Sequence, residues 1–283
     1  MTKQAPLLMI IWITIMSLMG SCTPKSQPLA TNDIQFDSLA SVDSQIIMLD
    51  TIAAKCKVKM LMDFPATCGD KYDLKQLQAL FIHAMITSNT PVTSPEEAML
   101  QYKDSCFNDF NMQISELQKM LPNFKEDPPA FVTDFYHQKD VVPAFNKADF
   151  LSIASNFYDF TGGAHGYGAE IYKNYDLQTM KQIVLADIFG EENFEKIAEL
   201  IVEQLVKDYH VESPQQLEET GFFNIKQIVP TENFCLTDSA MLFSYTRYDI
   251  APYSMGQINV EVSYNQLKPF TKPNSVINRL FTK

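Results

Sequence analysis

The sequence predicts an α+β fold, with a largely antiparallel sheet and amphipathic helices packed on it. Residues 55–64 alternate apolar and charged side chains, which is the period of a half-buried strand. Residues 73–87 and 94–121 instead repeat apolar side chains every three or four positions, as amphipathic helices do. Helical and strand-like stretches are mixed without a regular strand–helix–strand rhythm, which favours α+β over a parallel α/β fold.

The N-terminus predicts export and lipidation. Lys3 precedes an apolar run over residues 7–19, which is shorter than the roughly 20 residues that span a bilayer as a helix. The run ends in "LMGSC", which resembles a bacterial lipobox, so Cys22 is the expected lipidation site after removal of residues 1–21. An ordinary signal peptide or an uncleaved anchor is the alternative.

Residues 22–44 are polar and have no sustained period, so we expect a tether between the lipid and the globular part. The globular module is expected over residues 45–283, with an N-terminal part at 45–130 and a C-terminal part at 131–283. In the first part, residues 44–53 are the expected antiparallel neighbour of the strand at 55–64. Asp73 is expected to cap the first helix, and Ser94 with Glu97 forms a capping box for the second.

The second helix is expected to bury one apolar stripe. It consists of Leu100, Phe107, Phe110, Ile114, Leu117 and Leu121.

In the C-terminal part, runs rich in aromatic and β-branched residues at 131–137, 149–160 and 167–177 predict three strands. An amphipathic pattern over 191–209 predicts a third long helix. Residues 233–237, 240–250 and 256–264 predict three further strands, and residues 264–270 a short closing helix.

The net charge limits the kinds of partner that the sequence predicts. A net charge of −12 argues against a nucleic-acid partner and is compatible with a basic protein partner or with simple solubility.

Four cysteines remain besides Cys22. An even count outside the cytoplasm suggests disulfides, although Cys106 beside an apolar helix face is equally a candidate buried free thiol. The pairing of Cys56, Cys68, Cys106 and Cys235 stays open. Their spacing matches no zinc site, and no cofactor or metal is expected.

The stretch "DFTGGAHGYG" at residues 159–168 is the first candidate site. Gly162 and Gly163 fit a hairpin connection, where glycine supplies positive φ without steric cost. His165 has acidic residues near it in sequence, but no nucleophile motif accompanies it, so no catalytic residue is assigned. The order of the glycines differs from that of a dinucleotide-binding loop.

The stretch "FSYTRYDIAPYSMGQINVEVSY" is the second candidate site. Tyr245, Arg247, Tyr248 and Tyr253 give it the aromatic and guanidinium composition that is enriched at binding hot spots. The alternative is that these tyrosines pack their rings on a half-exposed sheet.

Together, "FYDFTGGAHGYG", "NYDLQTMKQIVLADIF" and "FSYTRYDIAPYSMGQINVEVSYNQL" resemble, in order and spacing, the RsiV/PdaC-like family of extracytoplasmic domains. The resemblance covers about residues 150–270, and residues 55–87 resemble the companion N-terminal segment. In that family the module is the lysozyme-sensing ectodomain of an anti-sigma factor and also accompanies a polysaccharide deacetylase domain. Met180 departs from the pattern, because the family typically has glycine after "DLxT".

The resemblance implies a binding role outside the cytoplasm and assigns no catalytic residue. We therefore expect a lipid-anchored envelope protein, facing the periplasm or the exterior, that binds an envelope protein or glycan, with a lysozyme-like hydrolase as the sharpest candidate. The alternatives are an envelope carbohydrate-active enzyme or accessory domain, in which His165 would meet Asp159, Glu170 or Asp249, and a structural lipoprotein without a specific ligand.

Overall fold

The structure is a computed structural model that describes residues 28–49, 52–86, 91–120 and 132–281. The expected signal peptide and Cys22 lie outside these residues. Two sheets make up the fold, and the expected α+β class is confirmed.

The large sheet has six strands in chain order. They are β1 (Ile34–Leu49), β2 (Ile52–Cys68), β3 (Asp134–Lys147), β4 (Phe150–Phe160), β5 (Tyr167–Asp176) and β6 (Lys181–Ile183). All neighbouring pairs are antiparallel except β2 and β3, which run parallel. The connection between these two parallel strands carries the helices α1 (Leu74–Met85) and α2 (Pro95–Met120). The large sheet therefore combines strands from the N-terminal part (residues 45–130) and from the C-terminal part (residues 131–283) of the predicted module.

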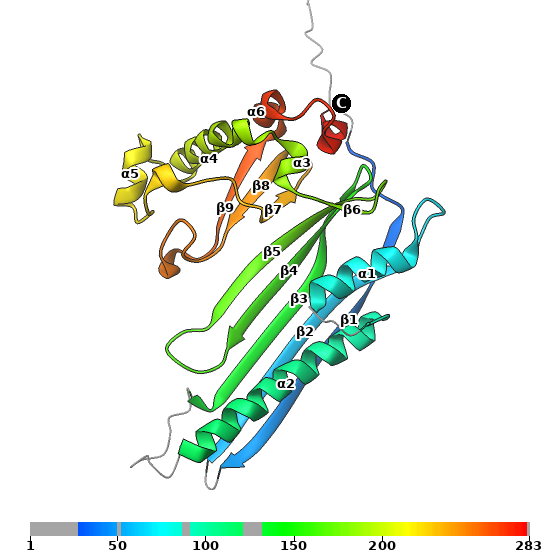
Figure 1. Cartoon of the computed structure of the whole chain (residues 1–283), viewed down its shortest axis with the longest axis vertical. Helices are drawn as coiled ribbons and strands as arrows, with labels where there is room; N and C mark the ends of the chain where they lie inside the picture. Colours follow the sequence, from blue (N-terminus) through cyan, green and yellow to red (C-terminus); the bar gives the residue numbers. More distant parts are fainter. Residues whose placement is uncertain (1–27, 50–51, 87–90, 121–131, 282–283) are drawn as a thin grey trace, which may run out of the picture.

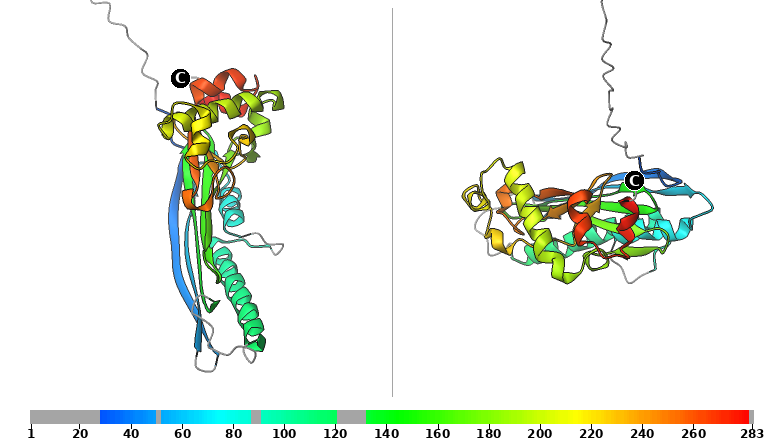
Figure 2. Two further views of the ribbon diagram at one scale, coloured as in Figure 1. Left: turned by 90° about the vertical axis from the view of Figure 1, so that its left-hand side faces the viewer. Right: turned by 90° about the horizontal axis from the view of Figure 1, so that it is seen from above.

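Helices α1 and α2 cover one face of the large sheet, and the opposite face is open over much of its length (Figures 1 and 2). Asp73 caps α1 by accepting a hydrogen bond from the Gln76 backbone, as predicted. Ser94 likewise accepts a hydrogen bond from the Glu97 backbone at 3.2 Å. The Glu97 carboxylate accepts from the backbone of Thr93, one residue before the expected donor.

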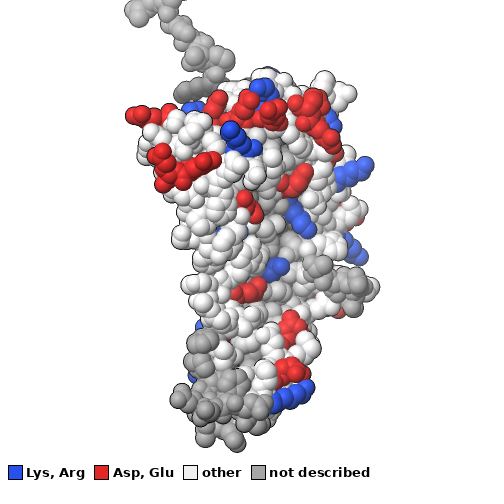
Figure 3. Space-filling view, turned by 60° about the vertical axis from the view of Figure 1, so that its left-hand side comes forward, with Lys and Arg blue, Asp and Glu red and all other residues white. Residues whose placement is uncertain are grey.

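The small sheet is antiparallel and lies at one end of the molecule (Figure 1). Its strands are β7 (Phe234–Leu236), β8 (Ala240–Tyr245) and β9 (Ile258–Ser263), as the sequence predicts. The helices of this half are α3 (Leu185–Ile188), α4 (Phe194–Asp208), α5 (Pro214–Glu219) and α6 (Tyr264–Leu267). Acidic side chains gather at this end of the molecule (Figure 3).

The tether prediction is wrong from Ile34 onward, because residues 34–44 belong to β1. This strand is the edge of the sheet, and polar residues (Ser41, Asp43 and Gln45) occupy half-buried positions on its inner face. The outward positions instead carry exposed apolar residues, including Val42, Ile46 and Met48, so the sequence shows no apolar inner face here. The alternation along β1 is also broken at Asp37 and Ser38, which are both exposed. Phe36 and Leu39 pack against the core beneath α1 and α2.

The apolar stripe predicted for α2 is wrong at Leu100, which is 52% exposed. Met99 is buried instead, together with Ala98, Cys106, Phe110 and Ile114. Successive residues are about 100° apart around a helix, so Leu100 points away when Met99 faces the sheet.

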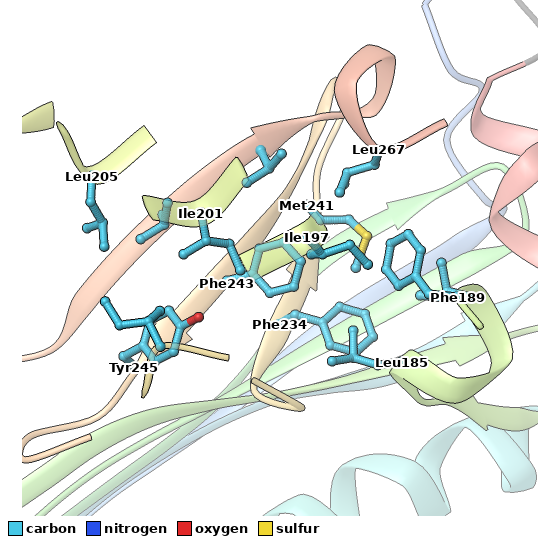
Figure 4. Packing of buried hydrophobic residues seen from close by; sticks show 14 of the residues in the cluster. Leu185, Phe189, Ile197, Ile201, Leu205, Phe234, Met241, Phe243, Tyr245 and Leu267 are labelled. Atoms are coloured by element: carbon cyan, nitrogen blue, oxygen red, sulfur yellow. The ribbon is translucent and has the colours of Figure 1, made fainter. Parts of the chain in front are cut away.

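Two main cores stabilise the two halves. One lies between the large sheet and α1 and α2, and the other lies between the small sheet and α3, α4 and α6 (Figure 4). In the second core Phe189, Phe234 and Phe243 are fully buried around Ile197 and Met241. A third, small cluster joins the two sheets and contains Ala154, Tyr172 and Cys235.

Candidate functional site at the edge of strand β5

The glycine loop connects β4 to β5 as a hairpin, as predicted. Asp159 pairs with Tyr167, so residues 160–166 make the reversal. Gly162 and Gly163 have φ values of 98° and 94°, in the region that glycine adopts without steric cost. At Gly166 a Cβ atom would collide with the ring of Tyr158 and with the Asp159 carbonyl oxygen.

Beyond this hairpin, β5 is an edge strand for most of its length. Strand β6 pairs only with residues 174–176 of β5, which leaves residues 167–173 without a neighbouring strand on that side in the part of the chain that the structure describes. The backbone groups of every second residue point outward along such an edge and require partners when buried.

Side chains of the small sheet supply these partners. Gln257 accepts a hydrogen bond from the Glu170 N–H and donates one to the Glu170 carbonyl, both at 2.8 Å. Asn233 accepts from the Tyr172 N–H at 2.8 Å and donates to the Glu170 carbonyl at 3.0 Å. Two amide side chains therefore act as a substitute strand beside β5.

The same edge binds two residues of the tyrosine-rich stretch. Arg247 donates through Nη1 to the Gly168 carbonyl, and the Tyr253 hydroxyl donates to the Gly166 carbonyl at 2.5 Å. The Arg247 guanidinium also lies over the Tyr253 ring, 5.1 Å from its centroid. We call the four side chains Asn233, Arg247, Tyr253 and Gln257 the edge clamp, because they fasten the small sheet to β5.

The clamp brings the two candidate stretches together in space. The His165 ring stacks on the Tyr253 ring with centroids 5.5 Å apart, and the Tyr248 ring lies 5.9 Å from that of Tyr253. His165 is exposed, and Tyr248 is 62% exposed. We call His165, Tyr248 and Tyr253 the aromatic ledge.

Tyr248 also has an unusual backbone. Its φ is 72°, a left-handed conformation that is an outlier for a bulky side chain. The backbone N–H donates to the Ala251 carbonyl at 3.1 Å, and the Asp249 carboxylate accepts from the backbone N–H and the hydroxyl of Thr246. The turn therefore holds this tyrosine outward at the expense of backbone strain.

Tyr245 does not belong to the ledge, which corrects its placement on a surface. It is 3% exposed, and its hydroxyl donates to the Val229 carbonyl at 2.8 Å. Tyr245 is the last residue of β8 and faces the core of the small-sheet half, so only the residues after the strand reach the surface.

His165 has no hydrogen bond or ion pair with Asp159, Glu170 or Asp249 in the described part of the chain. Asp159 contacts another histidine, His137, at 2.7 Å between Oδ1 and Nδ1. The Nε2 atom of His137 is buried without a hydrogen-bond partner among the described residues. Cys106 lies in the same region, but burial raises its pKa to about 11, so it is a poor nucleophile there.

All four described cysteines are free, and three of them are buried. The disulfides suggested by their even number are therefore absent from the described structure, and the buried-thiol alternative holds for Cys106. Desolvation raises the pKa of Cys56 and of Cys235 to about 12.

The described residues hold no group of three or more His, Cys, Asp or Glu side chains arranged for a metal ion. They also include no helix with the length and apolar character needed to cross a membrane.

Sequence reasoning missed Asn233 and Gln257. Both lie within predicted strands, but a single amide side chain carries no sequence signal for pairing with a distant strand edge. Gln257 is 87 residues from the Glu170 backbone that it binds. The weak signal available was the glycine at position 256, directly before Gln257 and two residues before β9; it has a φ of 74°.

Fold and site together define a two-sheet α+β protein in which side chains of the small sheet close an open edge of the large one. Residues 186–265, which contain α3 through β9, match the family described as "Protein of unknown function (DUF3298)". The matched segment includes all four residues of the edge clamp.

Two solved structures are similar to the whole chain. A member of the DUF3298 family from Bacteroides fragilis aligns with a TM-score of 0.79 and 24% identity, covering 90% of this chain and 100% of its own. A DUF3298 family protein from Pseudomonas aeruginosa PAO1 aligns with a TM-score of 0.57 and 21% identity, covering 86% of this chain and 97% of its own. At these identities the likeness shows the fold. No curated protein matches the chain in sequence.

Proposed function

We propose that this chain is an extracytoplasmic binding module, anchored through a lipid on Cys22, that recognises a protein or glycan of the cell envelope. The exposed Tyr248 ring is the observation that best supports a binding role. Its left-handed backbone is costly, and its outward side chain has no packing within the core that would offset that cost. Together with the stacked rings of His165 and Tyr253, it offers an aromatic surface typical of protein and sugar recognition.

We favour a basic protein, similar to lysozyme, as the partner. Residues 185–220 contain ten acidic and only two basic residues, and α4 from this segment packs on β9 of the small sheet. An acidic surface beside the aromatic ledge would attract a basic protein and raise its association rate. The resemblance to the RsiV/PdaC-like family supports the same choice.

Calorimetric titration with lysozyme tests this proposal. We expect saturable binding that weakens between low salt and about 150 mM salt, because screening reduces the attraction between exposed charges. Tyr248→Ser should weaken binding roughly tenfold, as expected for loss of one aromatic anchor. Met112→Ser is the matched control, because Met112 is equally exposed, at 62%, on helix α2.

Absence of heat at both salt concentrations would remove lysozyme as the partner. Equal weakening by Tyr248→Ser and Met112→Ser would remove the aromatic ledge as the contact surface. Titration with peptidoglycan fragments in parallel distinguishes a glycan ligand, whose binding should change little with salt because stacking on aromatic rings is not screened.

A further inference from the structure

A second feature lies on the helix-covered face of the large sheet, beneath α1. A cavity of about 160 Å³ is lined by His83 and Ala84 of the helix and by side chains of strands β3, β4 and β5. Its polar side chains are His83, Lys139, Ser155 and Lys173. No aspartate or glutamate lines it, although the chain as a whole carries a net charge of −12.

The two lysines have no carboxylate partner within 4.0 Å among the described residues. The Lys139 ammonium instead lies 5.4 Å from the centroid of the Tyr102 ring. Asp159 is near enough to favour the charged form of Lys139, but its Oδ1 contacts His137. Burial lowers the pKa of Lys139, which is the expected cost of placing an ammonium in this setting.

The apolar lining of the cavity defines the rest of the site. Ile153, Phe157 and Ile171 form its floor on the sheet. Lys139 also lines a neighbouring groove of about 480 Å³ between α1 and α2, so the ammonium stands at the boundary of the two spaces. A ligand in this position would meet positive charge at one end and apolar surface at the other.

We propose that this cavity, the cationic pocket, binds a small organic anion whose carboxylate or phosphate lies between Lys139 and Lys173 and whose apolar part lies on Ile153, Phe157 and Ile171. Two unpaired ammonium groups in a partly buried space are each costly unless an anion compensates them. A carboxylate or phosphate supplies that compensation with charge-assisted hydrogen bonds. The site is separate from the aromatic ledge, because its lining lies on the helix-covered face of the sheet and includes none of the ledge residues.

Binding of benzoate, inorganic phosphate and neutral benzamide, followed by two-dimensional amide NMR, tests this proposal on the folded chain. We expect saturable binding of benzoate or phosphate at millimolar concentrations and no saturation by benzamide. Benzoate binding tighter than phosphate indicates an amphipathic anion, and the reverse indicates that the oxyanion alone is recognised. Both results support the anion site.

Lys139→Gln and Lys173→Gln should each weaken the anion roughly fivefold or more, in line with the loss of one charge-assisted hydrogen bond. Lys139→Arg should retain most of the binding. Lys57→Gln is the matched control, because Lys57 is exposed on the opposite face of the same sheet. Should Lys139→Gln fail to fold, Lys173→Gln decides alone.

The proposal is overturned by any of three results. The first is that neither anion saturates below about 20 mM, which corresponds to a negligible affinity. The second is that benzamide binds as tightly as benzoate. The third is that Lys173→Gln binds like the original protein or that Lys57→Gln weakens binding equally.

Discussion

At the scale of single residues, Asp149 connects several parts of the chain. It occupies the two-residue turn between β3 and β4, where both Ala148 and Asp149 have left-handed backbones with φ of 54° and 62°. Its carboxylate accepts hydrogen bonds from the Tyr72 hydroxyl at 2.7 Å and from Gln178 at 2.9 Å, and it forms an ion pair with Lys71 at 2.5 Å. Desolvation alone would raise the pKa of Asp149, but these donors prevail and lower it to about 2.

This pKa predicts how stability depends on pH. A carboxyl group with a depressed pKa in the folded state stabilises the protein above its unfolded pKa, near 4, and loses that contribution as the pH falls toward about 2. The free energy of unfolding should therefore exceed that of Asp149→Asn by about 2 kcal/mol at neutral pH and by almost nothing near pH 2.

Urea denaturation at several pH values measures this difference. Asp238→Asn is the control, because Asp238 forms an exposed ion pair with Lys147 and should contribute less than about 1 kcal/mol. A difference for Asp149→Asn that stays constant from pH 7 to pH 2 would contradict the assignment.

Met180 shows what the sequence could and could not predict at this scale. The resembled family typically has glycine at this position, so the sequence did not predict which backbone conformation the turn adopts. The structure gives Met180 a φ of 55°. The turn keeps the left-handed backbone although a methionine occupies it, and the side chain packs partly against the core beneath α1 and α2. Contacts with residues distant in sequence therefore override the local preference.

At the scale of elements, α2 allows a direct test of which residues face the sheet. Phe110 is fully buried and packs edge-on against Phe135 with ring centroids 5.2 Å apart, whereas Leu100 is largely exposed. Phe110→Ala should lower the free energy of unfolding by about 3–5 kcal/mol, the usual cost of removing a buried phenyl ring. Leu100→Ala should change it by no more than about 0.5 kcal/mol.

Chemical denaturation of the two variants side by side checks this contrast. A loss of several kcal/mol in Leu100→Ala would mean that α2 turns the face predicted from its apolar stripe toward the sheet.

Most elements could be predicted from local pattern. The strand at 55–64, both helices that follow it and the meander from residue 131 have clear periodicity, and each is present in the structure. Strand β1 was missed over residues 34–44, because polar residues such as Ser41 and Asp43 occupy half-buried positions on its inner face. The short helices α3 and α5, of four and six residues, were also missed, because so few turns carry no measurable period.

At the scale of the whole molecule, the candidate site depends on contacts that no local pattern reveals. The sequence indicated the glycine loop and the tyrosine-rich stretch separately. Their meeting depends on Asn233 and Gln257, which bind the edge of β5 from more than sixty residues away. Apolar contact between the sheets comes from the cluster around Tyr172 and Cys235 and from Phe145, Phe150 and Ile183 of the large sheet, which join the core of the small-sheet half. The edge clamp adds polar contacts to this connection.

The central claim is therefore that the edge clamp closes β5 and thereby builds the aromatic ledge. Hydrogen–deuterium exchange of the Glu170 and Tyr172 amides tests it most directly. Both N–H groups should exchange as slowly as paired strand amides, and the double variant Asn233→Ala with Gln257→Ala should accelerate them, because each lost partner costs about 1–3 kcal/mol. The amides between β3 and β4 should keep their protection in the variant. Fast exchange of Glu170 and Tyr172 in the unaltered protein, at the rate of an exposed loop, would contradict the account.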